Sequence, residues 1–174
     1  MDLTNTINTL LAIGTVLIEA LCVLLLVMII TKDKGPLAKW FYEKSLILIF
    51  LVSGGSMLAS LVYSEIIGYT PCLMCWYQRI AIYGIAIISF VALIKKHSKE
   101  VWSYISTLSV IGAVVAMVHV FSRFTNSEIF DCSASGPSCL QELFTKFGYI
   151  DIPVMSLSAL VFIILLIVNR KRFV

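Results

Sequence analysis

The sequence predicts an all-α fold, a polytopic membrane helix bundle with five spans. Of the 174 residues, 60% are hydrophobic and 13% are charged, with a mean hydropathy of +0.99. That balance is more apolar than in soluble domains. A spanning helix needs about 20 mostly apolar residues, and five stretches meet this requirement: Ile7–Ile30, Ser45–Ile67, Trp76–Ile94, Val101–Phe121 and Pro153–Val168. We therefore expect residues 1–174 to form a single integral membrane domain.

The basic residues fix the orientation of the bundle. Ten of the thirteen Lys and Arg residues lie after the first, third or fifth span, as four, three and three respectively. Only Arg79, Arg123 and Lys146 belong to the other side. By the positive-inside rule the C-terminus is cytoplasmic and the N-terminus lies outside. The net charge of +3 is then a topology signal and does not call for a nucleic-acid partner.

The first apolar stretch reads as an uncleaved span rather than a signal peptide. Residues 1–6 contain no Lys or Arg, and the lysines follow the apolar run. We expect this span to pack beside the other four helices. Within it, Cys22 is expected to be a free thiol that behaves as a small apolar side chain. Glu19 is expected to be protonated and hydrogen-bonded to a neighbouring helix.

The first cysteine pair, Cys72 and Cys75, opens the third span. Gly68 is suited to end the preceding helix, Thr70 to be an N-cap and Pro71 to be the first helical residue. Side chains three residues apart share a helix face, so the two sulfurs can form a disulfide. The positive end of the helix dipole favours a thiolate at this position.

Arg79 lies four residues after Cys75, one turn deeper on the same face. A guanidinium at this depth must pair, reach the interface or bind a ligand. It can lower the pKa of Cys75 and donate hydrogen bonds to a carbonyl oxygen of a flat apolar cofactor. The alternative is an interfacial arginine that binds lipid phosphate. His119, in the outer half of the fourth span, is a second cofactor candidate, or else simply a hydrogen-bonding partner for another helix.

The second pair, Cys132 and Cys139, flanks a Ser/Gly/Pro-rich loop. A disulfide closing about eight residues restrains the unfolded chain by only about 2.5 kcal/mol, so it can be an exchanger or a bridge that shapes the loop. The apolar spacing over Leu140–Ile150 predicts a short helix, lying in the membrane interface or packed on the bundle ends. Both pairs fall on the outward side, where disulfides persist.

A Cys-x-x-Cys motif alone also occurs in zinc sites and structural bridges. A zinc site favours a second, equally close pair, and six residues separate Cys132 from Cys139. No metal ligands are therefore predicted. A metal carrier and a transporter or scaffold with two structural bridges remain as competing hypotheses.

The chain resembles the DsbB family of membrane thiol:quinone oxidoreductases over roughly residues 45–170. The run Cys-Leu-Met-Cys-Trp-Tyr-Gln-Arg at 72–79 is similar to the BdbC-type branch. The resemblance implies a four-helix DsbB-like core, with the stretch at about 7–30 as an extra N-terminal span that it does not explain. In vitamin K epoxide reductase-like proteins the loop pair precedes the Cys-x-x-Cys, which is the reverse of the order here.

The resemblance also implies a relay in a bacterial cytoplasmic membrane, with its active site on the extracytoplasmic face. A reduced DsbA-like thioredoxin-fold partner would attack the Cys132–Cys139 disulfide, with Cys132 forming the mixed disulfide. Electrons would pass to Cys72–Cys75 through Cys72, and Cys75, near Arg79, would reduce a bound quinone, either ubiquinone or menaquinone. His119, thirteen residues before Cys132, matches a family histidine near the quinone. Gln78 stands where many relatives carry an acid, so no carboxylate role is assigned there.

Overall fold

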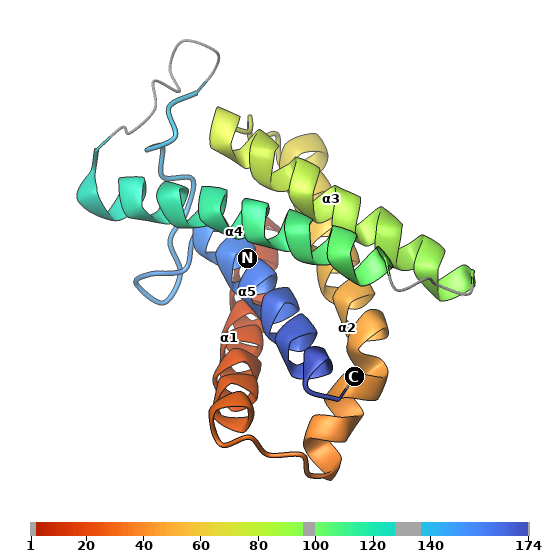
Figure 1. The fold of residues 1–174 in the computed structure, drawn as a ribbon. Helices are drawn as coiled ribbons and strands as arrows, with labels where there is room; N and C mark the ends of the chain where they lie inside the picture. The colour runs from red at the N-terminus through yellow and green to blue at the C-terminus, as the bar shows by residue number, and fades with distance from the viewer. Residues whose placement is uncertain (1–2, 96–99, 128–136, 174) are drawn as a thin grey trace.

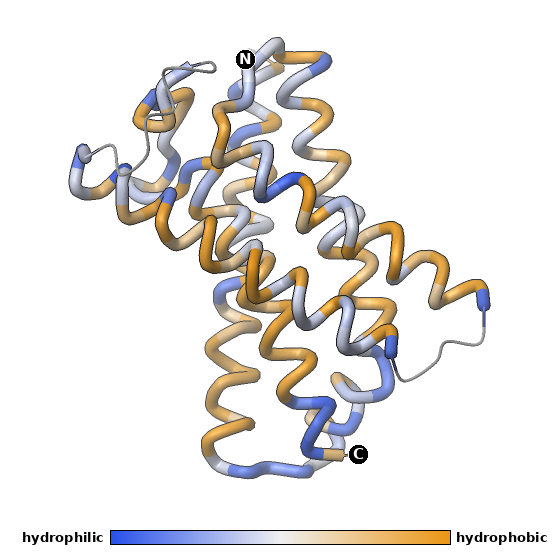
Figure 2. Tube along the Cα trace, turned by 45° about the horizontal axis from the view of Figure 1, so that its top comes forward, coloured by the Kyte–Doolittle hydropathy of each residue, from blue (hydrophilic) through white to orange (hydrophobic). Residues whose placement is uncertain are grey.

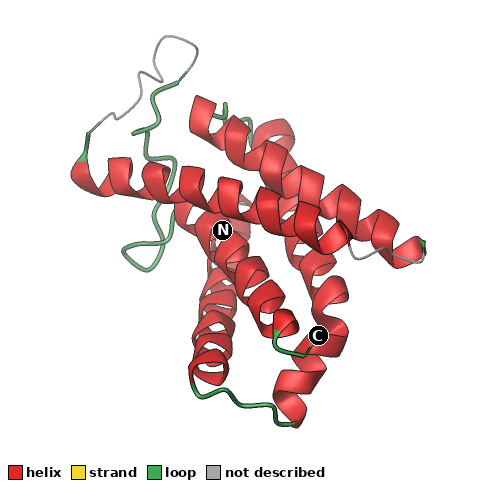
Figure 3. Ribbon diagram, in the orientation of Figure 1, coloured by secondary structure: helices red, strands yellow, loops and turns green. Residues whose placement is uncertain are grey.

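The computed structural model describes residues 3–95, 100–127 and 137–173. Figure 3 shows that helices dominate, and the described residues contain no β-strand beyond one isolated bridge. Five helices are long and apolar enough to cross a membrane, which confirms the predicted multi-span, all-α fold. These are α1 (Leu3–Ile30), α2 (Pro36–Leu61, extended by the π-helical turn η1, Val62–Ile66), α3 (Leu73–Ile94), α4 (Glu100–Thr125) and α5 (Ile152–Lys171).

Helix α5 is the centre of the bundle. It packs against α1, α2 and α4, while α3 packs between α2 and α4. In Figures 1 and 2 the α3–α4 pair crosses α1 and α5 obliquely. The extra span α1 rests chiefly on α5 and touches α2 only sparsely, so the expectation that it packs on the bundle is confirmed.

The hydropathy of the residues varies along the length of the bundle. Figure 2 shows apolar residues along the middle of the helices and hydrophilic residues near the ends and connections. Many large apolar side chains, such as Leu17 and Ile87, lie exposed on the outside of the bundle. Such a surface suits lipid rather than water, because a helix satisfies its backbone groups internally and leaves only side chains to meet the bilayer.

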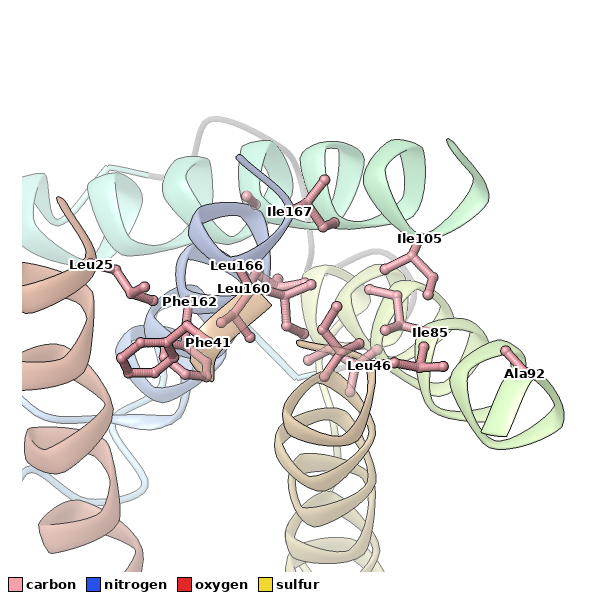
Figure 4. Packing of buried hydrophobic residues seen from close by; sticks show 14 of the residues in the cluster. Leu25, Phe41, Leu46, Ile85, Ala92, Ile105, Leu160, Phe162, Leu166 and Ile167 are labelled. Carbon is pink, nitrogen blue, oxygen red and sulfur yellow. The ribbon is translucent and has the colours of Figure 1, made fainter. Parts of the chain in front are cut away.

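The interior is packed by apolar side chains from every helix. Figure 4 shows Leu25, Phe41 and Phe162 meeting in one part of this cluster, and Ile85 and Ile105 in another. Where α4 crosses its neighbours, a glycine allows very close approach. A Cβ at Gly112 would stand 2.8 Å from the Cβ of Ala81 and 3.2 Å from Leu160. Small residues at helix crossings are the usual means of close packing in membranes.

The start of α3 differs slightly from expectation. Gly68, at φ +85°, ends the preceding helical segment as predicted. The N-cap, however, is Cys72 in an extended conformation, so Thr70 and Pro71 precede the helix instead of starting it. The first turn is therefore displaced by two residues, and Cys72 sits at the helix end rather than inside it.

The predicted helix over Leu140–Ile150 is wrong. This segment consists of turns, with Phe147 and Gly148 both at positive φ and a pair of 2.9 Å backbone bonds between Lys146 and Ile150. Two successive left-handed residues cannot continue a right-handed helix. Asp151 then caps α5 by accepting a 3.0 Å hydrogen bond from the Val154 amide. Of the apolar side chains in the segment, Ile150 is buried whereas Phe147 is 60% exposed, so the apolar period does not correspond to one buried face.

Candidate active site

The first cysteine pair lies at the N-terminal end of α3. Cys72 is the N-cap residue and is buried, and Cys75 lies in the first turn. Both are free thiols, and their sulfurs are 3.2 Å apart. The prediction that spacing and helical geometry bring the two sulfurs together is confirmed.

Cys139, from the connection between α4 and α5, packs on this pair. It is buried in a small cluster with Cys72 and Met74 and is disulfide-bonded. Cys132 lies outside the described residues. The Sγ atoms of Cys72 and Cys139, together with a ring nitrogen of His119, all lie within 4.8 Å of one another. The structure therefore brings one sulfur of the second pair next to the first pair.

Arg123, in the last turn of α4, holds the Cys139 segment in place. Its Nη1 donates a short hydrogen bond to the carbonyl of Leu140, the residue after Cys139. Its Nε lies 3.3 Å from the Asp151 carboxylate at the start of α5, and its Nη2 lies 3.0 Å from Glu142. The side chain is only 9% exposed, so these contacts are partly shielded from water. One guanidinium thus ties α4, the connection and α5 together beside the cysteines.

His119 lies between the two cysteine-bearing segments. Its Nε2 is 3.1 Å from the carbonyl oxygen of Cys139 and 3.9 Å from the sulfur of Cys72. Its Nδ1 is 3.0 Å from Nε2 of Gln78. A carbonyl only accepts hydrogen bonds, so Nε2 carries the proton; Nδ1 of the neutral ring is then the acceptor of the Gln78 amide. Both side chains are almost fully buried, at 2% and 3% exposure.

These contacts favour a thiolate at Cys72. The hydrogen bond from the Cys75 thiol, and to a lesser degree the one from His119, lower the pKa of Cys72 to about 4, against the burial that opposes this shift. A sulfur at a helix N-terminus is already favoured as an anion. Within this pair the thiolate is therefore favoured at Cys72, with the Cys75 thiol as its hydrogen-bond donor.

Arg79 lies one turn below Cys75, as predicted. Its Nη2 donates a 3.1 Å hydrogen bond to the carbonyl of Ser60 on α2, and its guanidinium stacks on Trp76 at 5.3 Å from the ring centroid. A guanidinium has five N–H donors in a fixed fork, so it can serve a further acceptor while holding this position.

A cavity of about 360 Å³ connects these groups. Its wall includes Cys75, Arg79 and His119 and is mostly apolar elsewhere. All five helices contribute to it, and α1 does so through Leu11, Gly14, Thr15 and Ile18. Among the described residues that line it, three buried hydroxyls have no hydrogen-bond partner: those of Tyr63, Tyr83 and Ser156. Apolar walls with a few unpaired polar groups are typical of a small-molecule site.

Two other polar groups of the spans lie outside this cavity wall. Glu19 accepts hydrogen bonds from Tyr149, at 2.7 Å, and Ser158, at 2.9 Å, which confirms that it is hydrogen-bonded to a neighbouring helix. Cys22 is a half-buried free thiol 3.9 Å from the Ser158 carbonyl, as expected.

Sequence reasoning missed Gln78, Arg123 and Tyr83 as parts of the site. Gln78 has a detectable signal, because it is a polar residue within a mostly apolar span, three residues after Cys75. In the sequence, Arg123 is recognisable only as one of the basic residues used to infer topology. Tyr83 continues the series Cys75, Arg79 at intervals of four residues, which places all three on one face of α3.

The comparisons with known proteins show the family to which the chain is similar. The family model for "Disulfide bond formation protein DsbB" matches residues 42–169, which exclude α1. A probable disulfide formation protein of Metapseudomonas resinovorans is 37% identical over 130 residues, covering 73% of this chain and 90% of the relative. The SPbeta prophage-derived disulfide bond formation protein B of Bacillus subtilis (strain 168) is 39% identical over 116 residues, covering 66% and 78%. Disulfide bond formation protein C of the same organism is 35% identical over 112 residues, covering 63% and 80%.

No solved structure matches the chain significantly. The family model covers well over half of the chain and includes most of α2 and α5 and all of α3 and α4, together with Cys72, Cys75 and Cys139. With five apolar helices and paired cysteines at one end of the bundle, this multi-pass membrane protein belongs to the DsbB family of disulfide bond formation proteins.

Proposed function

We propose that this protein is a membrane thiol:quinone oxidoreductase that reoxidises an extracytoplasmic DsbA-like oxidase. The observation that carries the proposal is the position of Cys75. Its thiol is within hydrogen-bonding distance of Cys72, which faces Cys139, and it also lines a cavity that contains Arg79. One residue thus adjoins both the thiol exchange site and a ligand site within the bilayer.

The relay proceeds by two thiol–disulfide exchanges. The partner's dithiol reduces Cys132–Cys139, with Cys132 forming the mixed disulfide. A Cys139 thiolate then attacks Sγ of Cys72 in the Cys72–Cys75 disulfide, that S–S bond breaks, and Cys75 leaves as a thiolate. Attack by the Cys132 thiolate on the new bond regenerates Cys132–Cys139, so two electrons and two protons end on Cys72 and Cys75. Free thiols at Cys72 and Cys75 with Cys139 in a disulfide match the end of this exchange.

Each neighbouring residue has a defined task in this exchange. His119 donates its Nε2 proton towards the sulfur of Cys72 and the Cys139 carbonyl, and so stabilises the anion that forms during exchange. Arg123 keeps the Cys139 segment against α4. A contact of His119 with the quinone itself remains a prediction, based on its place in the cavity wall.

The cavity fits a quinone, either ubiquinone or menaquinone. Its apolar wall suits a flat ring, and the unpaired hydroxyls and the Arg79 guanidinium suit carbonyl oxygens. A bound quinone supplies a two-electron acceptor drawn from the membrane pool. Arg79 would hold a ring oxygen and stabilise negative charge on it, while the Cys75 sulfur lies one helical turn above. A DsbA-type oxidant has a potential of about −120 mV, so a continuously supplied oxidising acceptor is needed.

Thiol trapping tests this function. In membranes, depleting quinone should leave Cys72 and Cys75 reduced, and adding ubiquinone or menaquinone should restore their disulfide. A Cys22→Ser variant is the matched control, because it removes a cysteine away from the site. If the pair stays oxidised without quinone, the proposal fails. Substituting Cys72 or Cys75 with Ser should abolish oxidation of secreted proteins at unchanged abundance, whereas a scaffold would lose abundance.

Cys72, His119 and Cys139 also form a candidate metal cluster. Zinc needs thiolate ligands, and the sulfur of Cys139 is held in a disulfide. Exchange therefore explains the cluster better than metal binding. Elemental analysis of the reduced and oxidised protein discriminates the two, since a metal carrier retains stoichiometric metal after purification.

A further inference from the structure

Tyr83 lines the same cavity as Arg79, and its hydroxyl is unpaired among the described residues. The residue lies on α3, eight residues after Cys75 and four after Arg79, so sulfur, guanidinium and phenol descend one helix face in steps of one turn. The Tyr83 hydroxyl is buried and has no hydrogen-bond partner in the part of the chain that the structure describes. Leaving a buried hydroxyl unpaired is unfavourable, and it therefore points to a polar atom of a ligand in the cavity.

The spacing along α3 suits a ligand with two opposed oxygens. One helical turn rises about 5.4 Å, which is close to the separation of the two carbonyl oxygens across a para-quinone ring. We propose that the Tyr83 hydroxyl donates a hydrogen bond to the second carbonyl of the quinone ring, with Arg79 at the first. This inference rests on the proposed function and adds a residue that orients the ring. With both oxygens held, the edge of the ring nearest Cys75 is fixed.

The substitution Tyr83→Phe tests this role, because it removes one oxygen atom and keeps the ring that packs in the bundle. Binding is measured directly, by quenching of tryptophan fluorescence with a ubiquinone that carries a one-isoprene tail; Trp76 beside Arg79 is a nearby reporter. The Kd should rise about tenfold, equivalent to about 1.4 kcal/mol. The rate of Cys72–Cys139 exchange should stay unchanged.

Tyr104→Phe is the matched control, since this tyrosine lies 59% exposed on α4 and away from the cavity wall. Unchanged quinone affinity in Tyr83→Phe overturns the inference while leaving the function intact. Absence of quinone binding in the unsubstituted protein instead contradicts the proposed function.

A separate observation concerns α1, which lies before the stretch that the family model matches. Leu11, Gly14, Thr15 and Ile18 all line the cavity, although α1 packs chiefly on α5 and little on α2. Helix α1 therefore forms one side of the cavity and makes few contacts with α2. At Gly14 an added Cβ would meet no atom of the described residues within 4 Å.

We infer that α1 and α2 flank the isoprenoid tail of the quinone, and that Gly14 leaves room for it. The proposed occupant is the tail because the same cavity is continuous with Arg79 and Cys75. This inference also rests on the proposed function, but it is independent of Tyr83.

The test compares Gly14→Leu with Ala20→Leu, which adds the same kind of side chain to an exposed position of α1. Gly14→Leu should weaken binding of a long-tailed ubiquinone about tenfold and that of the one-isoprene ubiquinone much less. Ala20→Leu should change neither. If Gly14→Leu affects both quinones equally or not at all, the tail does not pass α1. Thermal melting in detergent shows whether either variant is misfolded, and Gly14→Ala is then the milder substitution to compare.

Discussion

Gln78 on α3 and His119 on α4 form a buried hydrogen bond of 3.0 Å between Nε2 and Nδ1. The Cys139 carbonyl places the imidazole proton on Nε2, and the Gln78 amide donates to the remaining nitrogen, Nδ1. A neutral amide thus helps to orient an imidazole whose proton points to the Cys139 carbonyl and to Cys72. Gln78 is accordingly a positioning residue rather than a catalytic one.

Substitution of Gln78 should shift the pH profile of Cys72. Gln78→Ala removes the hydrogen bond that orients the imidazole ring, so the apparent pKa of Cys72 should rise and exchange should slow about tenfold. Alkylation rates as a function of pH measure this pKa. If Gln78 had only a structural role, the pH profile of Cys72 alkylation would be unchanged in a variant that folds.

Cys72 should stay reactive in mild acid. With its pKa lowered to about 4, alkylation of the reduced protein should persist to pH 5 and fall as pH drops through about 4. An ordinary thiol, with a pKa of about 8.5, loses reactivity far earlier. The lowered pKa also contributes to the stability of the reduced protein. The contribution of the thiolate is complete above about pH 8.5 and is lost as pH falls towards 4. A midpoint near 8 in the native protein would contradict the site geometry.

Cys72 and Cys139 should form a disulfide when their partners are removed. In the double variant Cys75→Ser, Cys132→Ser, the sulfurs of Cys72 and Cys139 lie within 4.8 Å of each other, so mild oxidation should cross-link them. Adding Arg123→Ala should lower the yield, since the Leu140 carbonyl and Asp151 lose their shared donor. Peptide mapping identifies the bond, and Cys22 provides the internal comparison. Equal yields with and without Arg123 would show that other contacts hold the segment.

Arg79 should matter for the quinone step more than for exchange. Arg79→Lys keeps a positive charge but loses the planar fork, so KM for ubiquinone should rise about tenfold while Cys72–Cys139 cross-linking is unchanged. Steady-state oxidation of a dithiol substrate provides KM and kcat separately. A loss of cross-linking in this variant would indicate that Arg79 supports the fold instead.

Gly112→Ala should destabilise the bundle. The new Cβ would be 2.8 Å from the Cβ of Ala81, so α3 and α4 must separate, at a cost of about 1–3 kcal/mol. Gly54→Ala is the matched control, because its Cβ would meet Phe50 at an ordinary 3.7 Å. Thermal melting in detergent should show a lower Tm for Gly112→Ala only. A similar Tm for both would mean that the crossing is more adaptable than the structure indicates.

The spans, the helix end at Gly68 and the pairing of Cys72 with Cys75 follow from the sequence alone. Each depends on local quantities: the transfer of apolar side chains into lipid, the left-handed conformation that glycine adopts readily, and the three-residue spacing of a helix. Residue type and spacing therefore suffice to identify Cys72, Cys75, Arg79 and Cys139 as candidates. The roles assigned to them, and to Cys132 outside the described residues, remain proposals.

Contacts between distant segments were decided only by tertiary structure. A turn at Phe147–Gly148 replaces the predicted helix. The conformation of this segment depends on the hydrogen bond from Arg123 and on the cap of α5 at Asp151, and its own apolar period does not determine it. The Gln78–His119 bond joins residues 41 positions apart, and the contact of Cys139 with Cys72 joins residues more than 60 positions apart. The part of the cavity wall that α1 provides is likewise distant in sequence from the rest. Apolar side chains at such distances favour burial without specifying a partner, because the hydrophobic term is non-directional. The crossing of α3, α4 and α5 selects those partners.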